Sequence, residues 1–485
     1  MLLAGITAAL GLPLVLRCVL DVQINYNEGW NAYRQQAAAL GQPLYGTPPG
    51  FAVTNYPPIS FHLVGFLGWF CGDMVLAGRL TSLLAIALIA LVLSRIGRCL
   101  SGSGAVGACC GLCWLAGVEF WTPERIGTND PQLLAIAFQA VGLLAFLRQP
   151  ARSRFLLAAA MLIAVGLFTK HNLLALPVGM TLSLAVRAAW RELAVWILAG
   201  AASCVVLFAA TIAVDGRLFL ANMLTPRAFL PAQELTMSLS YMLFAAPVLV
   251  AAAAWAWRER GSAVSSLSLS WIASLLEIVA FAGGDGVAGN IFQDAIMMSA
   301  LLQPLALQQL LAQRHAGAGR RSSGGLLVWL SLMVVPLFLV ERVPATWRAW
   351  HALSQQQVGF RQGVALLRDQ SGPVMCETLL LCFRAGKPSA FDAYYVQDEI
   401  RLGRLSASTI DRLLQQHLLA AIAIGSSEDP ESSDPAHLPW RFSRSFMEAL
   451  WTHYRPVLTT ANFTIFLPDE TYDYRGGAEG IGRVR

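Results

Sequence analysis

Apolar runs of about 20 residues recur from the N-terminus of this 485-residue chain to about residue 340. A helix of that length crosses the hydrocarbon core of a bilayer and satisfies its own backbone hydrogen bonds there. The chain is 56% hydrophobic and 13% charged, whereas soluble domains carry roughly a quarter charged residues. The sequence therefore predicts a polytopic α-helical membrane protein rather than a soluble one.

The apolar runs define about eleven predicted transmembrane helices. They lie near residues 2–20, 75–94, 100–118, 131–147, 155–168, 172–186, 193–214, 239–257, 264–282, 291–312 and 325–340. The first run has no basic segment before it and no small-residue cleavage site after it. We therefore expect a retained first span rather than a signal peptide.

Arginine is distributed unequally between the two sets of loops that join these spans. One set holds Arg95, Arg98, Arg148, Arg152, Arg154, Arg187, Arg191, Arg258, Arg260, Arg314, Arg320 and Arg321. The other set has fewer basic residues over longer segments: Arg34, Arg125, Lys170, Arg217 and Arg227. Because loops rich in basic residues lie on the cytoplasmic side, we expect a cytoplasmic N-terminus. The first loop, about 21–74, and the C-terminal region are then extracytoplasmic.

The composition changes at about residue 341, where charges appear and apolar runs shorten. Short apolar runs at 374–376, 421–425 and 463–467 predict strands, and helical patterns lie around 358–370, 407–417 and 442–455. This alternation predicts a small α/β domain, so the chain divides into a membrane domain, 1–340, and an extracytoplasmic domain, 341–485. Cys376 and Cys382 form a disulfide there if the chain turns between them; the sequence leaves that open.

The predicted topology gathers polar residues on the outer face of the membrane domain. They include Glu28, Arg125, Asn129, Asp130, Lys170, His171, Asn172 and Asp285. Transfer of a group from a phosphate-linked donor needs a carboxylate to deprotonate the acceptor hydroxyl. It also needs a cation or metal to stabilise charge on the leaving phosphate. The constellation therefore fits such a transfer.

Each of these residues also has a purely structural interpretation. Asn27 can cap a helix over 28–40 that Gly41 ends, and Glu28 then favours the helix dipole. Asp130 before a proline can cap the fourth span. Lys170 can snorkel to the membrane interface as an anchor. Spacing alone does not decide between the two interpretations.

The order of these segments along the chain is more specific than any one of them. An acidic residue in the first loop precedes Gly41-Gln42-Pro43-Leu44-Tyr45, Tyr56-Pro57-Pro58, Gly78-Arg79-Leu80, Asp130 and Thr169-Lys170-His171-Asn172. This order resembles the GT-C superfamily of integral-membrane glycosyltransferases. The bacterial branch related to protein O-mannosyltransferases and lipid A aminoarabinose transferases is the most similar. Residues 372–467 resemble the external domain of such bacterial members.

The resemblance implies transfer of a sugar from a polyprenyl-phosphate donor at the outer membrane surface, usually with inversion. It implies Glu28 as general base, Asp130 as a second catalytic carboxylate, and Lys170 with Arg125 at the donor phosphate. Many relatives carry Asp-Glu where this chain has Asn27 and Glu28, and an amide does not titrate. Glu28 then takes the role, or the first carboxylate is not essential in this branch, or activity is lost.

We further expect polar and aromatic side chains to contact the substrates: Asn27, Trp30, Tyr56, His171 and Asn172. The predicted function is a glycosyltransferase of a bacterial inner membrane, acting on a lipid-linked sugar donor and a cell-envelope acceptor in the lipid bilayer. We expect no nucleic-acid partner. A divalent metal cofactor, the sugar and the acceptor stay open. The alternatives are a transporter or flippase for a lipid-linked sugar, which would place ionisable residues at mid-membrane depth, and a non-catalytic scaffold.

Overall fold

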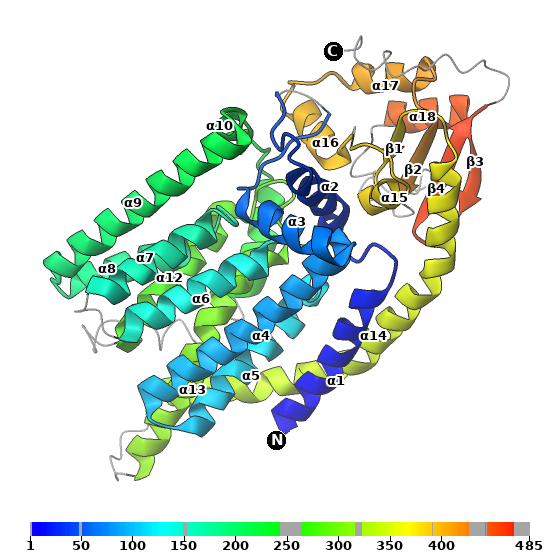
Figure 1. Ribbon diagram of the computed structural model, residues 1–485. Helices are drawn as coiled ribbons and strands as arrows, with labels where there is room; N and C mark the ends of the chain where they lie inside the picture. The colour runs from blue at the N-terminus through cyan, green and yellow to red at the C-terminus, as the bar shows by residue number, and fades with distance from the viewer. Residues whose placement is uncertain are drawn as a thin grey trace.

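The computed structural model describes residues 2–47, 51–148, 153–242, 263–315, 323–389, 391–425, 442 and 444–469, with backbone alone at 310, 313–315 and 323–338. Most of these residues are helical (Figure 1). Up to residue 315 the helices are α1 (Leu2–Leu16), α2 (Asn27–Ala39), α3 (Ile59–Cys71), α4 (Met74–Ser101), α5 (Gly104–Trp121), α6 (Gln132–Arg148), α7 (Ser153–Leu167), α8 (Ala175–Val186), α9 (Trp190–Asp215), α10 (Leu218–Met223), α12 (Ala263–Phe281) and α13 (Gln293–His315). Short 3-10 helices are η1 (Arg17–Val19), η2 (Pro123–Arg125) and η3 (Gly289–Phe292).

Five described helices are long and apolar enough to cross a membrane: Leu2–Val19, α4, α5, α9 and α12. Four shorter ones are also apolar: α3, α6, α7 and α8. This confirms a multi-pass α-helical membrane protein. The predicted span 239–257 lies largely outside the described residues, and 325–340 falls within the long helix α14 (Ser323–Arg368). The count of eleven spans stays a prediction.

The turn between α4 and α5 shows how local sequence ends and restarts a membrane helix. Asp73 opens α4 by accepting hydrogen bonds from the backbone N–H groups of Val75 and Leu76, as an N-cap residue does. Gly102 closes α4 in the left-handed region, with φ at 70°, where glycine has no steric penalty. Ser103 then caps α5. The two helices pack side by side as an antiparallel pair (Figure 1).

The first outer loop contains the helix that the sequence predicts over 28–40, observed as α2. Gly41 follows it in the left-handed region, with φ at 65°, which confirms how the helix ends. The predicted capping role of Asn27 is wrong. Asn27 lies inside the first turn, after Tyr26, and its side chain donates to Asp130 instead of capping.

The C-terminal part is a four-stranded sheet in the order β1-β2-β4-β3. Its strands are β1 (Val374–Cys376), β2 (Ala421–Gly425), β3 (Tyr454–Thr459) and β4 (Phe463–Pro468), and its helices are α15 (Leu379–Arg384), α16 (Ala393–Arg401), α17 (Ala407–Gln415) and α18 (Arg444–His453). β1 and β2 are parallel, and the other two pairs are antiparallel. The three predicted strands are confirmed. The sequence did not predict β3, whose residues are mostly exposed.

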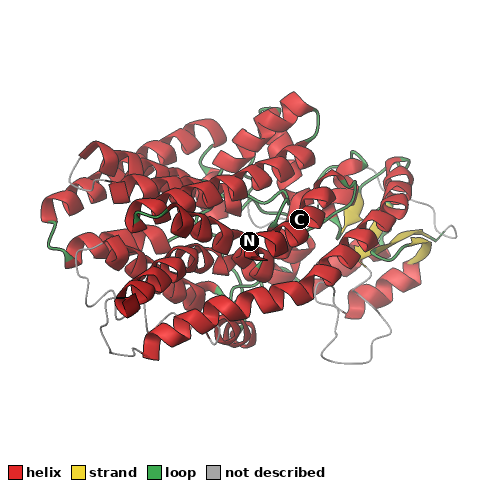
Figure 2. Cartoon of the chain, turned by 90° about the horizontal axis from the view of Figure 1, so that it is seen from below, coloured by secondary structure: helices red, strands yellow, loops and turns green. Residues whose placement is uncertain are grey.

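Both faces of the sheet are covered. Successive side chains of a strand point to opposite faces, and Ala421 to Ile424 of β2 are all buried. Ile422 and Ile424 pack with α17 and α18 on one face. Ala421 and Ala423 face a second cluster that includes Val22 and Ala32 of the first loop region. This second cluster joins the sheet to the membrane part, and the strands lie at one end of the molecule (Figure 2).

The helix α14 connects the two parts and runs as one element from the membrane bundle to the sheet (Figure 1). The predicted domain boundary at residue 340 therefore falls inside a helix. Beyond β1 the chain does turn back, and Cys376 and Cys382 form a disulfide with their Cα atoms 5.9 Å apart. The disulfide that the sequence leaves open is therefore present in the structure.

Candidate active site

A cavity of about 300 Å³ lies where the first loop, the loops between membrane helices and α16 meet. Its polar and aromatic lining comes from segments far apart in sequence: Asn25, Tyr26, Asn27, Trp30, Asn55, Tyr56, Glu124, Arg125, Thr225, Arg227, Asp285, Asp392, Tyr394, Tyr395 and Asp398. Four residues predicted to bind substrate or phosphate are among them: Asn27, Trp30, Tyr56 and Arg125. Glu28, Asp130, Lys170, His171 and Asn172 are not part of the lining.

Asp130 lies directly behind two residues of this lining. Its Oδ2 accepts hydrogen bonds from Asn27 Nδ2 at 2.8 Å and from Arg125 Nη1 at 3.0 Å. Its Oδ1 accepts from the backbone N–H of Gln132 at 2.9 Å. The last contact is the helix-capping role expected at the start of α6, so Asp130 caps the helix and joins the polar cluster at once.

The charge on Asp130 is stabilised by its surroundings. Burial alone would raise its pKa, but the fields of Lys170 and then Arg125, with the hydrogen bonds from Gln132 and Asn27, hold the pKa of Asp130 below its ordinary value. A carboxylate surrounded by cations and donors favours its ionised form. Asp130 is therefore an anion at neutral pH.

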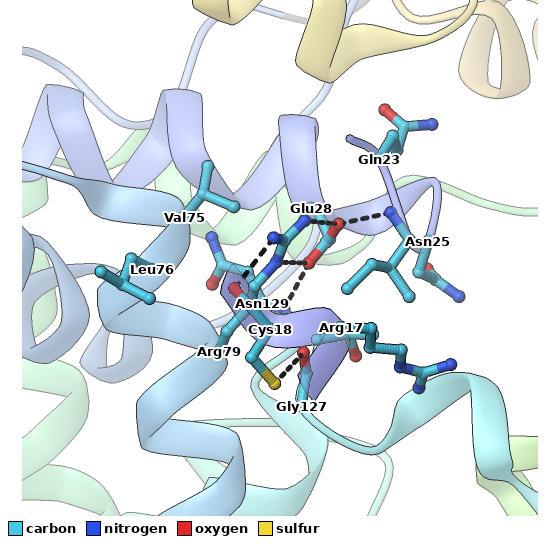
Figure 3. Close-up of polar contacts among 12 residues, drawn as sticks. Arg17, Cys18, Gln23, Asn25, Glu28, Val75, Leu76, Arg79, Gly127 and Asn129 are labelled. Carbon is cyan, nitrogen blue, oxygen red and sulfur yellow. Dashed lines mark hydrogen bonds and ion pairs between the residues drawn. The ribbon is translucent and has the colours of Figure 1, made fainter. Parts of the chain in front are cut away.

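The Glu28 carboxylate is hydrogen-bonded to Arg79 and to two backbone N–H groups (Figure 3). Arg79 Nε donates to Oε1 at 2.7 Å and Arg79 Nη2 donates to Oε2 at 2.8 Å. The backbone N–H of Asn129 donates to Oε1, and that of Ile24 donates to Oε2. A carboxylate offers about four acceptor positions, and these four bonds use them. In this conformation Glu28 has no position free to accept a proton from a substrate hydroxyl.

Arg79 is the partner that sequence reasoning missed. It lies in the Gly78-Arg79-Leu80 segment of α4, and its guanidinium also donates to the backbone carbonyls of Cys18, Leu20 and Val22. These contacts are buried. A buried arginine at the outer end of a span signals a buried anionic partner, and that signal was present in the sequence.

One polar face of α2 holds the segment before α6 in place. Glu28, Asn31 and Gln35 lie on this face at helical spacing, and all three bind Asn129. Asn31 Nδ2 donates to the backbone carbonyl of Asn129, and the side-chain amides of Gln35 and Asn129 exchange two hydrogen bonds. Gly78 allows this approach, because a Cβ there would lie 1.9 Å from Asn129 Oδ1. These hydrogen bonds hold Asn129, the residue before Asp130, in place.

Lys170 is buried, with 3% of its surface exposed, so the interpretation as a snorkelling anchor is wrong. Its ammonium lies over the ring of Tyr56, with Nζ 3.6 Å from the ring centroid. Within the described part of the chain this ammonium has no hydrogen bond or ion pair. Such a cation–π contact orients an ammonium while its donors stay unused.

The two residues after Lys170 lie at the edge of this group. His171 is exposed, and its ring centroid lies 6.4 Å from that of Tyr56. Asn172 is half-buried, and its Oδ1 has no hydrogen-bond partner among the described residues. The structure brings His171 near the cluster through Tyr56, and neither His171 nor Asn172 is part of the cavity lining.

The C-terminal part contributes carboxylates that sequence reasoning did not assign to the site. Asp392 caps α16 by accepting from the N–H groups of Tyr394 and Tyr395, and it also accepts from the hydroxyl of Tyr26 at 2.8 Å. Burial raises the pKa of Asp392 above its usual value. The local sequence carries no signal for this placement, because the contact joins residues 26 and 392.

A second group of charges closes the same side of the cavity. Asp398 accepts a hydrogen bond from the N–H of Ala228 at 2.9 Å, and Arg227 Nη1 donates to the carbonyl of Asp285 at 3.1 Å. The Asp285 carboxylate pairs with Arg401. Arg227 is therefore a second lining cation besides Arg125, and sequence reasoning did not include it.

The donor set does not fit a tightly held metal ion. Among the described residues, no group of three or more His, Cys, Asp or Glu side chains could hold one. Asp130 is already bound to an amide and a guanidinium. We derive no step through a metal.

Comparison with solved structures finds the fold of this chain in proteins that share little sequence with it. The chain is similar to ArnT from Cupriavidus metallidurans bound to undecaprenyl phosphate, with a TM-score of 0.63, 13% identity, and 96% of this chain and 98% of that chain covered. For the apo state of the same ArnT the TM-score is 0.61, with 13% identity and 96% and 97% covered. These likenesses confirm at the level of the fold the resemblance drawn from the sequence.

A weaker likeness is to the apo oligosaccharyltransferase of Archaeoglobus fulgidus, with a TM-score of 0.49, 11% identity, and 96% of this chain and 74% of that chain covered. No protein-family model matches the chain, and no curated protein matches its sequence.

Proposed function

We propose that the protein is an integral-membrane glycosyltransferase that moves a sugar from a polyprenyl-phosphate donor to a cell-envelope acceptor. The observation that carries the proposal is the arrangement of charges at the 300 Å³ cavity. Arg125 and Arg227 line it, and the buried ammonium of Lys170 lies on Tyr56 with its donors unused. The fold shared with ArnT, solved with undecaprenyl phosphate, supports the same donor class.

The donor phosphate is assigned to Lys170 and Arg125. Arg125 already binds Asp130 through Nη1, while its Nε has no hydrogen-bond partner among the described residues and only a 3.6 Å ion-pair contact with Glu124 Oε1. Charge-assisted hydrogen bonds from preorganised cations stabilise the charge that develops on a leaving phosphate. Arg227, which also lines the cavity, adds a third cation.

The aromatic lining suits a sugar between the two substrates. Trp30 and Tyr56 pack edge to face with ring centroids 4.9 Å apart. Such rings offer flat apolar faces and polar edges. We assign Asn27, Trp30 and Tyr56 to the sugar, with His171 and Asn172 at the mouth on the Tyr56 side.

Asp130 is assigned as the catalytic carboxylate. Three of its four acceptor positions are filled, and the fourth is assigned to the acceptor hydroxyl. As the acceptor oxygen bonds to the anomeric carbon, its proton passes to Asp130. The bond from that carbon to the phosphate oxygen breaks, and its electron pair stays on the polyprenyl phosphate. A single displacement of this kind inverts the anomeric carbon.

Glu28 is assigned as a positioning residue rather than as the general base. Its carboxylate holds Asn129, the neighbour of Asp130, and ties it to Arg79. This assignment accounts for Asn27 in place of an aspartate, because Asn27 donates a hydrogen bond to Asp130 that an ionised carboxylate cannot donate.

The topology completes the proposal. We place the cavity at the outer surface of a bacterial inner membrane, with eleven spans, a cytoplasmic N-terminus, a membrane domain of residues 1–340 and an extracytoplasmic domain of residues 341–485. Asp392 and Asp398 bring the second domain to the cavity wall. We therefore assign recognition of the acceptor to that domain.

A transfer assay tests the proposal. Purified protein in nanodiscs is given radiolabelled polyprenyl-phosphate sugars, with a membrane extract as acceptor. Wild type is compared with Asp130→Asn, Asp392→Asn and Glu28→Gln. Asp215→Asn is the matched control, because Asp215 also forms an ion pair, with His62 at 2.9 Å, and does not line the cavity.

We expect transfer by wild type and by Asp215→Asn, and a loss of at least about 100-fold in Asp130→Asn. Loss in Asp392→Asn with full transfer in Asp130→Asn would move the base to Asp392. A folded wild-type protein that transfers no label from any donor would contradict the proposed function.

A further inference from the structure

A second cavity, of about 350 Å³, lies between α1, the end of α5 and α14. Pro13 and Leu14 of α1 and Ala345 and Ala349 of α14 give it a mostly apolar wall. Glu124 lines both this cavity and the candidate active site. The two cavities therefore lie on opposite sides of the loop that precedes Asp130.

Three buried polar atoms on the wall of this cavity lack partners. Arg17 Nε, Glu119 Oε2 and Trp350 Nε1 have no hydrogen bond among the described residues, and all three residues line the cavity. Arg17 is 8% exposed and Glu119 is 6% exposed. Leaving such an atom unsatisfied is energetically unfavourable. Three orphaned atoms on one cavity wall indicate a ligand with both acceptor and donor groups.

Only part of these side chains is committed to the protein. Arg17 Nη2 donates to the carbonyls of Pro123 and Ile126, so Nε and Nη1 of the guanidinium remain for a ligand. Glu119 Oε1 lies beside Gly11, where an added Cβ would be 3.0 Å away. Oε2 of Glu119 is buried without a hydrogen-bond partner among the described residues and remains for a ligand.

The cavity lining holds both kinds of charged group. Arg17 and Arg342 are cations, Glu124 is a carboxylate, and Glu119 is a buried carboxyl group whose ionised form an ammonium beside it would stabilise. A ligand with one positive and one negative group matches this lining better than an anion does, because each of its charges meets an opposite one. The apolar wall adds room for hydrocarbon next to the charged groups.

The cavity opens beside α14, where its lining residues Arg342, Ala345 and Ala349 are exposed. Arg342 donates to the carbonyl of Phe120, and its Cζ lies 4.4 Å from the centroid of that ring. A lipid entering beside α14 reaches this cavity without passing through the active site.

We propose that this cavity binds the head group of phosphatidylethanolamine. The phosphate accepts hydrogen bonds from Arg17 Nε and Trp350 Nε1, and the primary ammonium donates to Glu119 Oε2. The acyl chains lie along Leu14 and Ala349. Lipid binding at this cavity does not depend on sugar transfer.

Native mass spectrometry of the full-length protein from nanodiscs tests this binding. The nanodiscs contain equal amounts of phosphatidylethanolamine, phosphatidylglycerol and phosphatidylcholine. Glu119→Gln removes the carboxylate charge, and Ala349→Phe fills the cavity without touching a polar group. Ala352→Phe is the matched control, an exposed alanine of α14 outside this cavity.

We expect wild type and Ala352→Phe to retain one phosphatidylethanolamine at collision energies that remove the other two lipids. We expect retention to fall at least fivefold in Glu119→Gln and in Ala349→Phe. Equal retention of the three lipids by wild type would overturn the proposal, and so would unchanged retention in Ala349→Phe. If Glu119→Gln does not fold, Ala349→Phe alone decides.

Discussion

Glu28 and Arg79 form a two-point ion pair with side chains that are 0% and 3% exposed, and the pair fixes the start of α2 against α4. Through Asn129, the same carboxylate also holds the segment that carries Asp130. An acidic residue that the sequence suggests as a general base thus lies at the centre of a structural network. The ion pair with Arg79 therefore distinguishes the structural role of Glu28 from the proposed catalytic role of Asp130.

Glu28→Gln is expected to destabilise the protein by about 3–5 kcal/mol, because it leaves the Arg79 guanidinium buried without an anion. Arg79→Met is expected to cost a similar amount. The double variant Glu28→Met, Arg79→Met is expected to cost less than the sum of the two single changes. Denaturant unfolding in detergent micelles measures these values.

A normally stable Glu28→Gln protein that transfers sugar like wild type would contradict the positioning role. A loss of transfer that follows the loss of folded protein supports the positioning role of Glu28.

The pH dependence of transfer is expected to report the low pKa of Asp130. Because its pKa in the folded protein is below the ordinary value, its charge and the stability it contributes are present above the unfolded-state pKa of about 3.9. Both are lost only as the pH falls through the lower folded value. Arg125→Gln removes one cause of the shift and is expected to move the acid limb of residual transfer to higher pH.

Arg227→Gln is the control for this shift, because Arg227 is not among the groups that lower the pKa of Asp130. Its acid limb is expected to stay at the wild-type position. An acid limb unchanged in Arg125→Gln would show that Asp130 does not govern it.

Gly29→Ala is expected to weaken the contact between α2 and α15. A Cβ at Gly29 would lie 2.2 Å from the backbone nitrogen of Leu380, so one of the two helices must move. Limited proteolysis between the membrane part and the sheet is expected to become faster. Gly46→Ala in the same loop is the control, because a Cβ there meets nothing within 4 Å, and equal cleavage rates for the two variants would refute the contact.

Loss of the Cys376–Cys382 disulfide is expected to destabilise the C-terminal part by about 2 kcal/mol, because the bond closes a short loop in the unfolded chain. The variant Cys376→Ser, Cys382→Ser measures this by thermal unfolding. Cys71→Ser and Cys99→Ser are controls, since both residues are exposed free cysteines. A melting temperature unchanged in the double variant would contradict the expectation.

The periodic part of the fold was predictable from sequence because burial in a membrane or a sheet imposes a regular pattern. The apolar runs located α4, α5, α9 and α12, and short apolar runs located β1, β2 and β4. The edge strand β3 was missed because its residues are mostly exposed and carry no such pattern.

The candidate site was predictable only in its membrane half. Asn27, Trp30, Tyr56 and Arg125 were expected and line the cavity. Asp392 was not, because a carboxylate that caps α16 looks like any helix cap until the tertiary contact with Tyr26 is known. Partners that are far apart along the chain, such as Tyr26 and Asp392, produce no recognisable local pattern in the sequence.

The two lysines of the chain allow the most direct test of the central claim, that the ammonium of Lys170 meets the phosphate of a lipid-linked sugar. Lys387 instead donates to the carbonyls of Arg368 and Gln370. Sugar transfer is measured for wild type, Lys170→Gln and Lys387→Gln, with folding checked by thermal unfolding. The account predicts that Lys170→Gln loses about 100-fold or more in transfer while staying folded, and that Lys387→Gln transfers sugar like wild type. Wild-type transfer by a folded Lys170→Gln protein would contradict the account.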